Sequence, residues 1–320
     1  MKKVVGLLFF LFVLNSCDDG NLVQEDITFE NTATQSCSTN NIIYKLKDKE
    51  ALILEIPESS FINEPTLEGS PRIINISSTN RVVYRFYNGA VSANNICETI
   101  PPATPIVTDQ WNATNGTIQI ITSAVKKTDA ATGRTKITGY NHNVVFKNIT
   151  FAKNNGTQVY ETFPFGDYVT TATTLPFGFD EVVEQCSTSK QIYNYTSSEA
   201  LTLDDIDPDL IKNEITPLDT PRTGLIGTTA NKLVYRLYSN GVLTPSYFCN
   251  STTPTLPTKS EEWIANTGVA NVSGIIEVTT TSVLGTFIHK IVLKKVVLTS
   301  GNSNFTLGDS YIYGELITTN

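Results

Sequence analysis

The stretch RVVYRFYNGA at residues 81–90 returns later in the chain as KLVYRLYSNG at residues 232–241. In both stretches, branched and aromatic side chains dominate and an Asn-Gly pair follows. This pattern is typical of a β-strand that ends in a tight turn. The stretch therefore predicts a β-structure that is built twice.

Alternation along the first stretch predicts which side chains share a face of the strand. Successive residues of a strand point to opposite faces, so Tyr84 and Phe86 lie on one face. Val83, Arg85 and Tyr87 lie on the other. This second face mixes apolar and charged residues, and we expect it to be partly covered.

Matching residues continue on both sides of this stretch, at a spacing of about 150 residues. The order of the matches is the same in both copies, and the period is too long for a solenoid, so each copy should be one domain. The matched pairs are Cys37 and Cys186, Glu50 and Glu199, Asn63 and Asn213, Thr66 and Thr216, Arg72 and Arg222, Arg85 and Arg236, Cys97 and Cys249, Trp111 and Trp263, His142 and His289, Lys147 and Lys294, and Gly166-Asp167 and Gly308-Asp309.

The rest of the chain consists mostly of short strand signals separated by turn residues, at a spacing of roughly 10 residues. We therefore predict an all-β protein with two tandem, homologous β-sandwich-like domains. Helical signals are few. Asp207-Pro208-Asp209 predicts the start of a short helix. Thr108 to Trp111 and Ser260 to Trp263 each predict a single capped helical turn.

The chain has five cysteines, and four of them occupy matched positions in the two copies. Four cysteines allow three pairings. Because each copy must fold alone, the duplication favours Cys37–Cys97 and Cys186–Cys249, one bridge in each domain. A symmetric pairing between the domains, Cys37 with Cys186 and Cys97 with Cys249, stays open.

The fifth cysteine, Cys17, follows an apolar N-terminal stretch that is too short to span a bilayer comfortably. Leu14-Asn15-Ser16-Cys17 resembles the lipobox of bacterial lipoproteins, which implies cleavage before Cys17 and acylation of that residue. The acidic residues Asp18 and Asp19 are similar to the surface-display signal of Bacteroidota lipoproteins. The resemblance implies an outer-membrane lipoprotein that faces the cell surface. A periplasm-facing lipoprotein, or an ordinary secretory signal with an incidental cysteine, is the alternative.

These features divide the chain into five parts. Residues 1–16 are expected to be a signal peptide, and residues 17–36 an acylated cysteine with a flexible tether. The first repeat is expected over residues 37–170 and the second over residues 185–320, with a linker at 171–184 between them.

Composition bears on the partners of the chain. The formal net charge is −8 and no Lys/Arg cluster stands out. We therefore expect no nucleic-acid partner. There is no Cys-x-x-Cys zinc spacing and no Gly-x-Ser-x-Gly, His-Glu-x-x-His or Walker motif. We expect no cofactor, no metal and no enzymatic activity.

Aromatic residues are the main candidates for ligand binding. Trp111 and Trp263 could stack on sugar rings, and Tyr87 and Tyr238 could extend such a surface. The competing interpretation, which base rates favour, is that these rings pack in a sandwich core or against a disulfide.

Other residues of chemical interest have simpler structural explanations. His142 and His289 are the only histidines, so neither copy can assemble a histidine metal site by itself. The matched carboxylates Glu50 and Glu199 could serve a hydrolase but are more simply explained by ion pairs and turns. The acidic run Asp204 to Asp209 lacks the Gly and Glu of a calcium loop, so a helix start is favoured over irregular calcium binding.

The expected lipid anchor at Cys17, the duplication and the absence of catalytic sequence motifs together favour a tethered, non-catalytic module. We expect it to bind or adhere to glycan or protein. A structural subunit of an envelope complex is the second hypothesis. A hydrolase that uses the repeated carboxylates is the third.

Overall fold

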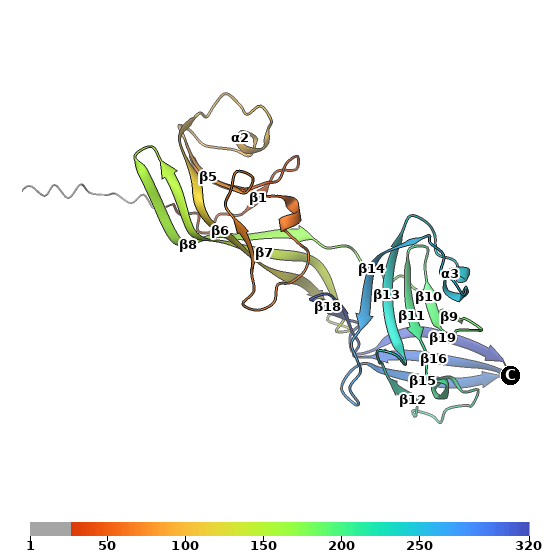
Figure 1. Ribbon diagram of the computed structural model, residues 1–320. Coiled ribbons are helices and arrows are strands. Elements are labelled where there is room, and N and C mark those ends of the chain that lie inside the picture. Colours follow the sequence, from red (N-terminus) through yellow and green to blue (C-terminus); the bar gives the residue numbers. More distant parts are fainter. Residues whose placement is uncertain (1–26, 320) are drawn as a thin grey trace, which may run out of the picture.

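A computed structural model describes residues 27–319 of the chain. The expected signal peptide, Cys17 and residues 18–26 lie outside the described residues. Strands account for 52% of the described residues and helices for 5%, in two curled sheets with one disulfide in each half. The predicted all-β fold class with two tandem β-sandwich-like units is confirmed (Figure 1).

The first copy is built on an eight-stranded sheet in the order β1-β2-β3-β5-β6-β7-β8, with β4 paired to β6. A 3₁₀ turn, η1 (Glu58–Ser60), and a short helix, α2 (Asn94–Cys97), lie in its connections. The strands are β1 (Gln35–Ser36), β2 (Ile42–Lys47), β3 (Glu50–Glu55), β4 (Arg72–Asn75), β5 (Arg81–Tyr87), β6 (Val107–Thr128), β7 (Thr135–Lys153) and β8 (Gly156–Thr171).

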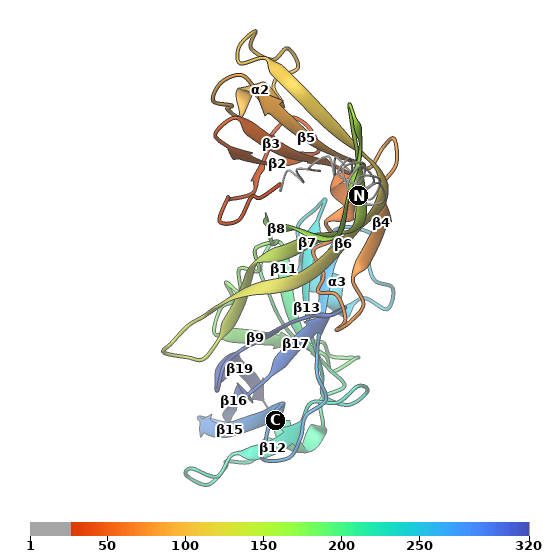
Figure 2. The same ribbon diagram turned by 90° about the vertical axis from the view of Figure 1, so that its left-hand side faces the viewer.

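Three of these strands are long, and they let one sheet form both layers of the domain. The first part of β6 pairs with β5, whereas its later part pairs with β4. The sheet therefore folds over on itself and encloses a core of buried side chains (Figures 1 and 2). That core includes Leu52 and Tyr84 from one layer and Ile118, Val144 and Phe146 from the other.

The second copy repeats this plan but interrupts the long strands, so its sheet has 11 strands. β6 of the first copy corresponds to β14 and β15, β7 to β16 and β17, and β8 to β18 and β19. The elements are β9 (Val182–Gln185), β10 (Ile192–Tyr195), β11 (Glu199–Asp204), η2 (Pro208–Ile211), β12 (Arg222–Leu225), β13 (Lys232–Ser239), α3 (Pro245–Cys249), β14 (Thr258–Ala265), β15 (Ile275–Val283), β16 (Thr286–Lys294), β17 (Val297–Ser300), β18 (Ser303–Thr306) and β19 (Tyr311–Thr319).

Both predicted disulfides are present, Cys37–Cys97 and Cys186–Cys249. Each bridge ties a short helix, α2 or α3, to the beginning of its own copy. In the first copy this segment lies over the outer face of the sheet, where Val83 and Tyr87 join a second buried cluster. The expectation that this mixed face is partly covered is thus confirmed.

The expected boundaries between tether, linker and domains need correction. Residues 27–36 were assigned to the flexible tether, yet Phe29 is buried in the first core and packs edge-on to Tyr84. In the expected linker, Phe177 stacks on Tyr235 with ring centroids 4.2 Å apart. Each copy therefore begins several residues before its first cysteine, with a phenylalanine that completes the core.

Two of the helical expectations were wrong, and one is confirmed. Thr108 to Trp111 lies within β6, and Ser260 to Trp263 lies within β14. Instead of forming a capped turn, these residues pair with the neighbouring strands β5 and β13 through backbone hydrogen bonds. The predicted start at Asp207 is correct, because its side chain accepts a hydrogen bond from the Asp209 N–H at the beginning of η2.

The match of Gly166-Asp167 to Gly308-Asp309 was also wrong. Gly166 lies opposite Val144 at a bulge in the β7–β8 pairing. The same bulge in the second copy places Gly314 opposite Ile291. Both glycines have a positive φ, 111° and 150°. The structural counterpart of Gly166 is therefore Gly314, which spacing alone did not reveal because the two copies differ in loop length.

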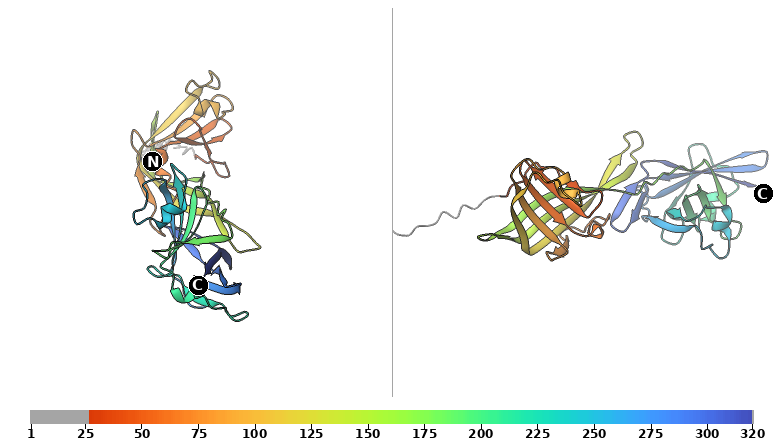
Figure 3. Two further views of the ribbon diagram at one scale, coloured as in Figure 1. Left: turned by 90° about the vertical axis from the view of Figure 1, so that its right-hand side faces the viewer. Right: turned by 90° about the horizontal axis from the view of Figure 1, so that it is seen from above.

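The two copies lie end to end, with the β6–β7 hairpin of the first reaching the β17–β18 hairpin of the second (Figures 1 and 3). Across this junction the Tyr140 hydroxyl lies 2.9 Å from the Ser303 hydroxyl. The Asn302 N–H donates to Glu64 and its side chain donates to the Pro65 carbonyl. Specific polar contacts therefore join the copies.

Candidate ligand-binding pocket

The aromatic residues proposed as a sugar platform do not form one. Trp111 is 1% exposed and Trp263 6% exposed, and their indole N–H groups donate to Asp109 and Glu261. Tyr87 and Tyr238 are also buried. A ring buried on both faces offers no surface for stacking, so the expected exposed platform is not present at these positions. Tyr238 nevertheless contributes to the floor of the pocket described below.

The matched histidines belong to a buried hydrogen-bond chain. In the first copy, Arg72 donates to the Thr122 hydroxyl, which lies 2.9 Å from Nδ1 of His142. Since an arginine can only donate, the Thr122 hydroxyl is free to donate to Nδ1. Nε2 of His142 then carries the proton and donates to Thr170, whose hydroxyl donates to Asn63. These hydrogen bonds therefore hold His142 in its neutral form.

The second copy repeats this chain residue by residue. Arg222 donates to Thr280, and the Thr280 hydroxyl lies 2.9 Å from Nδ1 of His289. Nε2 of His289 meets Thr318, which donates to Asn213. Burial and the nearby arginine lower the pKa of both histidines, that of His142 to about 4. The two histidines are therefore neutral structural groups in the folded protein.

The matched carboxylates also have structural partners. The Tyr84 hydroxyl donates to Glu50, and the Tyr235 hydroxyl donates to Glu199. Glu199 additionally accepts the backbone N–H groups of Phe177 and Gly178. Within residues 27–319, no group of three or more His, Cys, Asp or Glu side chains is arranged to hold a metal ion.

A pocket of about 350 Å³ opens on the outer face of the second copy. Its floor comes from β11 and β13, one wall from β14, and the opposite wall from α3 and the residues after it. The lining residues are Gln191, Thr202, Arg236, Tyr238, Tyr247, Phe248, Thr253, Lys259 and Glu262. The pocket thus combines hydrogen-bonding side chains with aromatic rings, as small-molecule sites commonly do.

The polar part of the pocket is centred on Arg236. Its Nε donates to Glu262 at 2.6 Å, and its Nη1 donates to Thr202 at 3.2 Å. Lys259 pairs with the other oxygen of Glu262 at 3.0 Å. Although burial raises the pKa of Glu262, the hydrogen bonds from Arg236 and Lys259 outweigh it and lower that pKa. Glu262 is therefore ionised at neutral pH.

The aromatic part comes mainly from α3, which the Cys186–Cys249 bridge holds in place. Tyr247 lies edge-on to Tyr238, with ring centroids 5.2 Å apart. Phe248 stacks on Tyr193 at 4.5 Å. Tyr247 and Phe248 are only half-buried, so parts of these rings face the pocket.

The corresponding position in the first copy is more apolar. The strand registers place Ile53 at the position of Thr202, and Gln110 at that of Glu262. Ile53 and Ile96 pack in a buried cluster that also contains Cys37 and Tyr87.

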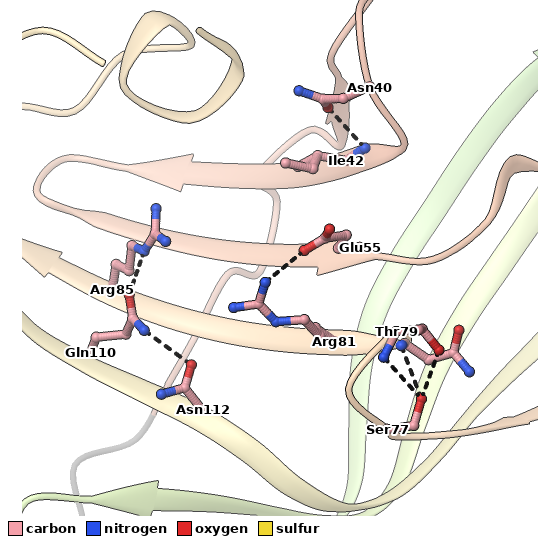
Figure 4. A network of polar contacts seen from close by, with 10 residues as sticks. Asn40, Ile42, Glu55, Ser77, Thr79, Arg81, Arg85, Gln110 and Asn112 are labelled. Atoms are coloured by element: carbon pink, nitrogen blue, oxygen red, sulfur yellow. Dashed lines mark hydrogen bonds and ion pairs between the residues drawn. The ribbon is translucent and has the colours of Figure 1, made fainter. Parts of the chain in front are cut away.

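Figure 4 shows the first-copy counterpart of Arg236. Arg85 donates to Gln110, which donates in turn to Asn112 on the same strand. Nearby, Arg81 pairs with Glu55 on the surface. Arg85 therefore takes part in a strand-to-strand contact, without the carboxylate and lysine that accompany Arg236.

Most of this pocket could not be predicted from the residues that the two copies share. The informative signal is where they differ, directly before the second cysteine of each pair. The first copy has Asn95-Ile96 there, and the second has Tyr247-Phe248.

No protein-family model matches the chain, and neither the curated proteins nor the solved structures contain a significant match. Among residues 27–319, no helix has the length and apolar character needed to cross a membrane.

Proposed function

We propose that this protein is a non-catalytic binding module for glycans, tethered to the cell envelope through Cys17. The pocket around Arg236 is its ligand site. The single observation that supports this proposal is the divergence of the two copies at this face. Where the first copy buries isoleucines, the second presents Thr202, Tyr247 and Phe248 around a charged centre.

Sugar rings carry hydroxyl groups at their edges and apolar C–H groups on their faces. Charged and amide side chains can donate to or accept from the hydroxyls, and aromatic rings can pack against the C–H face. Arg236, Lys259 and Gln191 supply the polar contacts, and Tyr247 and Phe248 supply the rings. Because the Arg236–Glu262–Lys259 group is paired internally, its geometry is organised before a ligand arrives.

The copies differ in role under this proposal. The second copy binds ligand, whereas the first lies nearer to the proposed anchor along the sequence. An acylated Cys17 would be separated from Ile27 by a short segment. Display at the outer-membrane surface is part of the proposal and is supported by the lipobox resemblance and the following aspartates.

Glycan-array screening of the chain beginning at Asp18, followed by calorimetry with the best ligand, tests this function. We expect Tyr247→Ala and Arg236→Ala each to weaken binding about tenfold or more, the loss expected for a buried polar or stacking contact. The matched control is Arg85→Ala, which removes the equivalent arginine of the first copy and should leave the affinity unchanged.

Two results would count against the proposal. One is a glycan whose affinity does not respond to Tyr247→Ala or Arg236→Ala. The other is equal loss of affinity in Arg85→Ala, because the effect would then come from general destabilisation. Crosslinking of the intact protein on cells to a protein partner through the Arg236 face, with no glycan bound on the array, would favour protein recognition instead.

A further inference from the structure

A second cavity, separate from the Arg236 pocket, lies between the two copies and has a volume of about 420 Å³. Small-ligand sites usually span roughly 300–1,000 Å³ and often occur where two domains meet. Both copies and the segment between them line the cavity. Its apolar lining residues are Ile137, Ala172, Leu175, Pro176, Phe177 and Phe305.

Arg134 reaches this cavity from the β6–β7 hairpin of the first copy. Its guanidinium lies 4.3 Å from the ring centroid of Phe177 and 5.7 Å from that of Tyr311. The cation therefore packs on aromatic rings of the second copy, and an arginine that stacks in this way keeps its N–H groups free at the edge of its plane.

The Nε of Arg134 is buried and has no hydrogen-bond partner among the described residues. A buried donor without a partner is unfavourable, at a cost of roughly 1–3 kcal/mol. Lys136, exposed at the same cavity, adds a second positive charge. The cavity thus joins apolar walls to cationic donors, one of them unsatisfied.

We infer that this cavity binds a small amphiphilic carboxylate, such as a medium-chain fatty acid. The carboxylate would accept hydrogen bonds from Arg134 and neutralise its charge, since planar guanidinium and carboxylate groups match each other. The apolar chain would lie against Ile137, Leu175 and Phe305. This site is independent of the Arg236 pocket, so it stands whether or not that pocket binds glycan.

Binding at this place would also strengthen the junction between the copies. Ile137 comes from the first copy and packs against the core of the second. A ligand that contacts Ile137 and Phe305 together would bury surface from both domains. Its binding would therefore stabilise the end-to-end arrangement by mass action.

The test is calorimetric titration of the chain beginning at Asp18 with dodecanoate, and with dodecanol as the uncharged analogue. We expect one dodecanoate per chain and at least about tenfold weaker binding of dodecanol. Arg134→Met should weaken dodecanoate binding by a similar factor and leave dodecanol unchanged. Arg134→Lys retains the charge without the planar set of donors. Its affinity for dodecanoate should therefore lie between those of the parent chain and of Arg134→Met.

The control for the junction itself is Lys126→Met. Lys126 donates to Asn304 across the same junction but does not line the cavity, so this variant should bind dodecanoate normally. Equal binding of dodecanol and dodecanoate would overturn the inference. So would unchanged binding in Arg134→Met, or a loss in Lys126→Met as large as that in Arg134→Met.

Discussion

Nδ1 of His289 lies 2.9 Å from the hydroxyl oxygen of Thr280, and both residues are fully buried in the second copy. His142 and Thr122 make the same contact at the same distance in the first copy. This polar pair recurs in both copies with the same arginine, threonine and asparagine partners, and these hydrogen bonds attach the loop before β4 or β12 to the sheet. Its role is structural, and it makes the stability of the fold depend on pH.

Stability should fall as the pH drops from about 6.5 towards 4. In the unfolded chain a histidine takes up a proton near pH 6.5, whereas the folded state keeps His142 neutral down to about pH 4. The unfolded state therefore binds more protons in this window, and His142 removes up to about 1.4 kcal/mol of stability per pH unit. The pKa of His289 is lowered by the same causes, so His289 changes stability in the same direction. Above pH 6.5 the contribution is fully present.

Urea unfolding at pH 7.5 and pH 5.5 measures this effect. Each copy has one tryptophan, so Trp263→Phe leaves Trp111 to report on the first copy alone. His142→Gln should have a smaller difference between the two pH values than the parent. An undiminished difference in that variant would show that other groups cause it.

Replacement of Arg222 by methionine should destabilise the second copy by about 2–4 kcal/mol, because buried acceptors lose a charged donor. Arg222 donates to Thr280 and to the Glu214 carbonyl. Unfolding followed by Trp263 in a Trp111→Phe background measures the loss. Arg81→Met provides a control, since Arg81 forms an exposed ion pair with Glu55 and should change stability by less than about 1 kcal/mol.

The disulfides should differ in their effect on ligand binding. Their sequence separations, 60 and 63 residues, predict a similar loss of about 4 kcal/mol from either copy when a bridge is removed. Only Cys186–Cys249 holds the α3 rings at the Arg236 pocket. Serine at Cys186 and Cys249 should therefore abolish glycan binding, and serine at Cys37 and Cys97 should preserve it. Calorimetry at a temperature where both variants remain folded distinguishes them, and equal loss would contradict the assignment of the pocket.

Gly314→Ala should destabilise the second copy more than Gly156→Ala destabilises the first. Gly314 lies where β19 pairs in parallel with β9, and an added Cβ would come within 2.3 Å of the Val183 side chain and 2.8 Å of the Glu181 carbonyl oxygen. Gly156 also has a positive φ but has nothing within 4 Å of an added Cβ. We expect a cost of more than about 2 kcal/mol for Gly314→Ala and about 1 kcal/mol for Gly156→Ala. Thermal unfolding of both variants tests this, and equal shifts would contradict it.

Much of the fold could be predicted because its signals are local. The strand over Ile275–Val283 and the turn after Tyr87 follow from alternation and an Asn-Gly pair over a few residues. The repeat favoured the disulfide pairing that the structure shows. The segments around Trp111 and Trp263 were predicted wrongly, since Thr108 to Trp111 and Ser260 to Trp263 each have the pattern of a capped helical turn. In the fold, pairing with β5 and β13 outweighs that local preference.

The candidate sites could not be predicted in the same way. Tyr247, Lys259 and Thr202 lie on different segments and meet only after the sheet has curled and α3 has been tied down. Arg134 stands in a polar hairpin that resembles any surface turn, and its contact with Phe177 requires a second domain at a defined position.

The sequence by itself determined that the chain is duplicated and all-β, and it favoured one bridge within each copy. These properties depend on periodicity and on matched positions, which a linear chain displays directly. Only the tertiary structure decided that the matched residues Arg72, His142, Arg222 and His289 are scaffold, and that polar and aromatic groups gather around Arg236 and Arg134. A binding site is a convergence of distant residues, and the geometry of that convergence is set by packing rather than by local sequence.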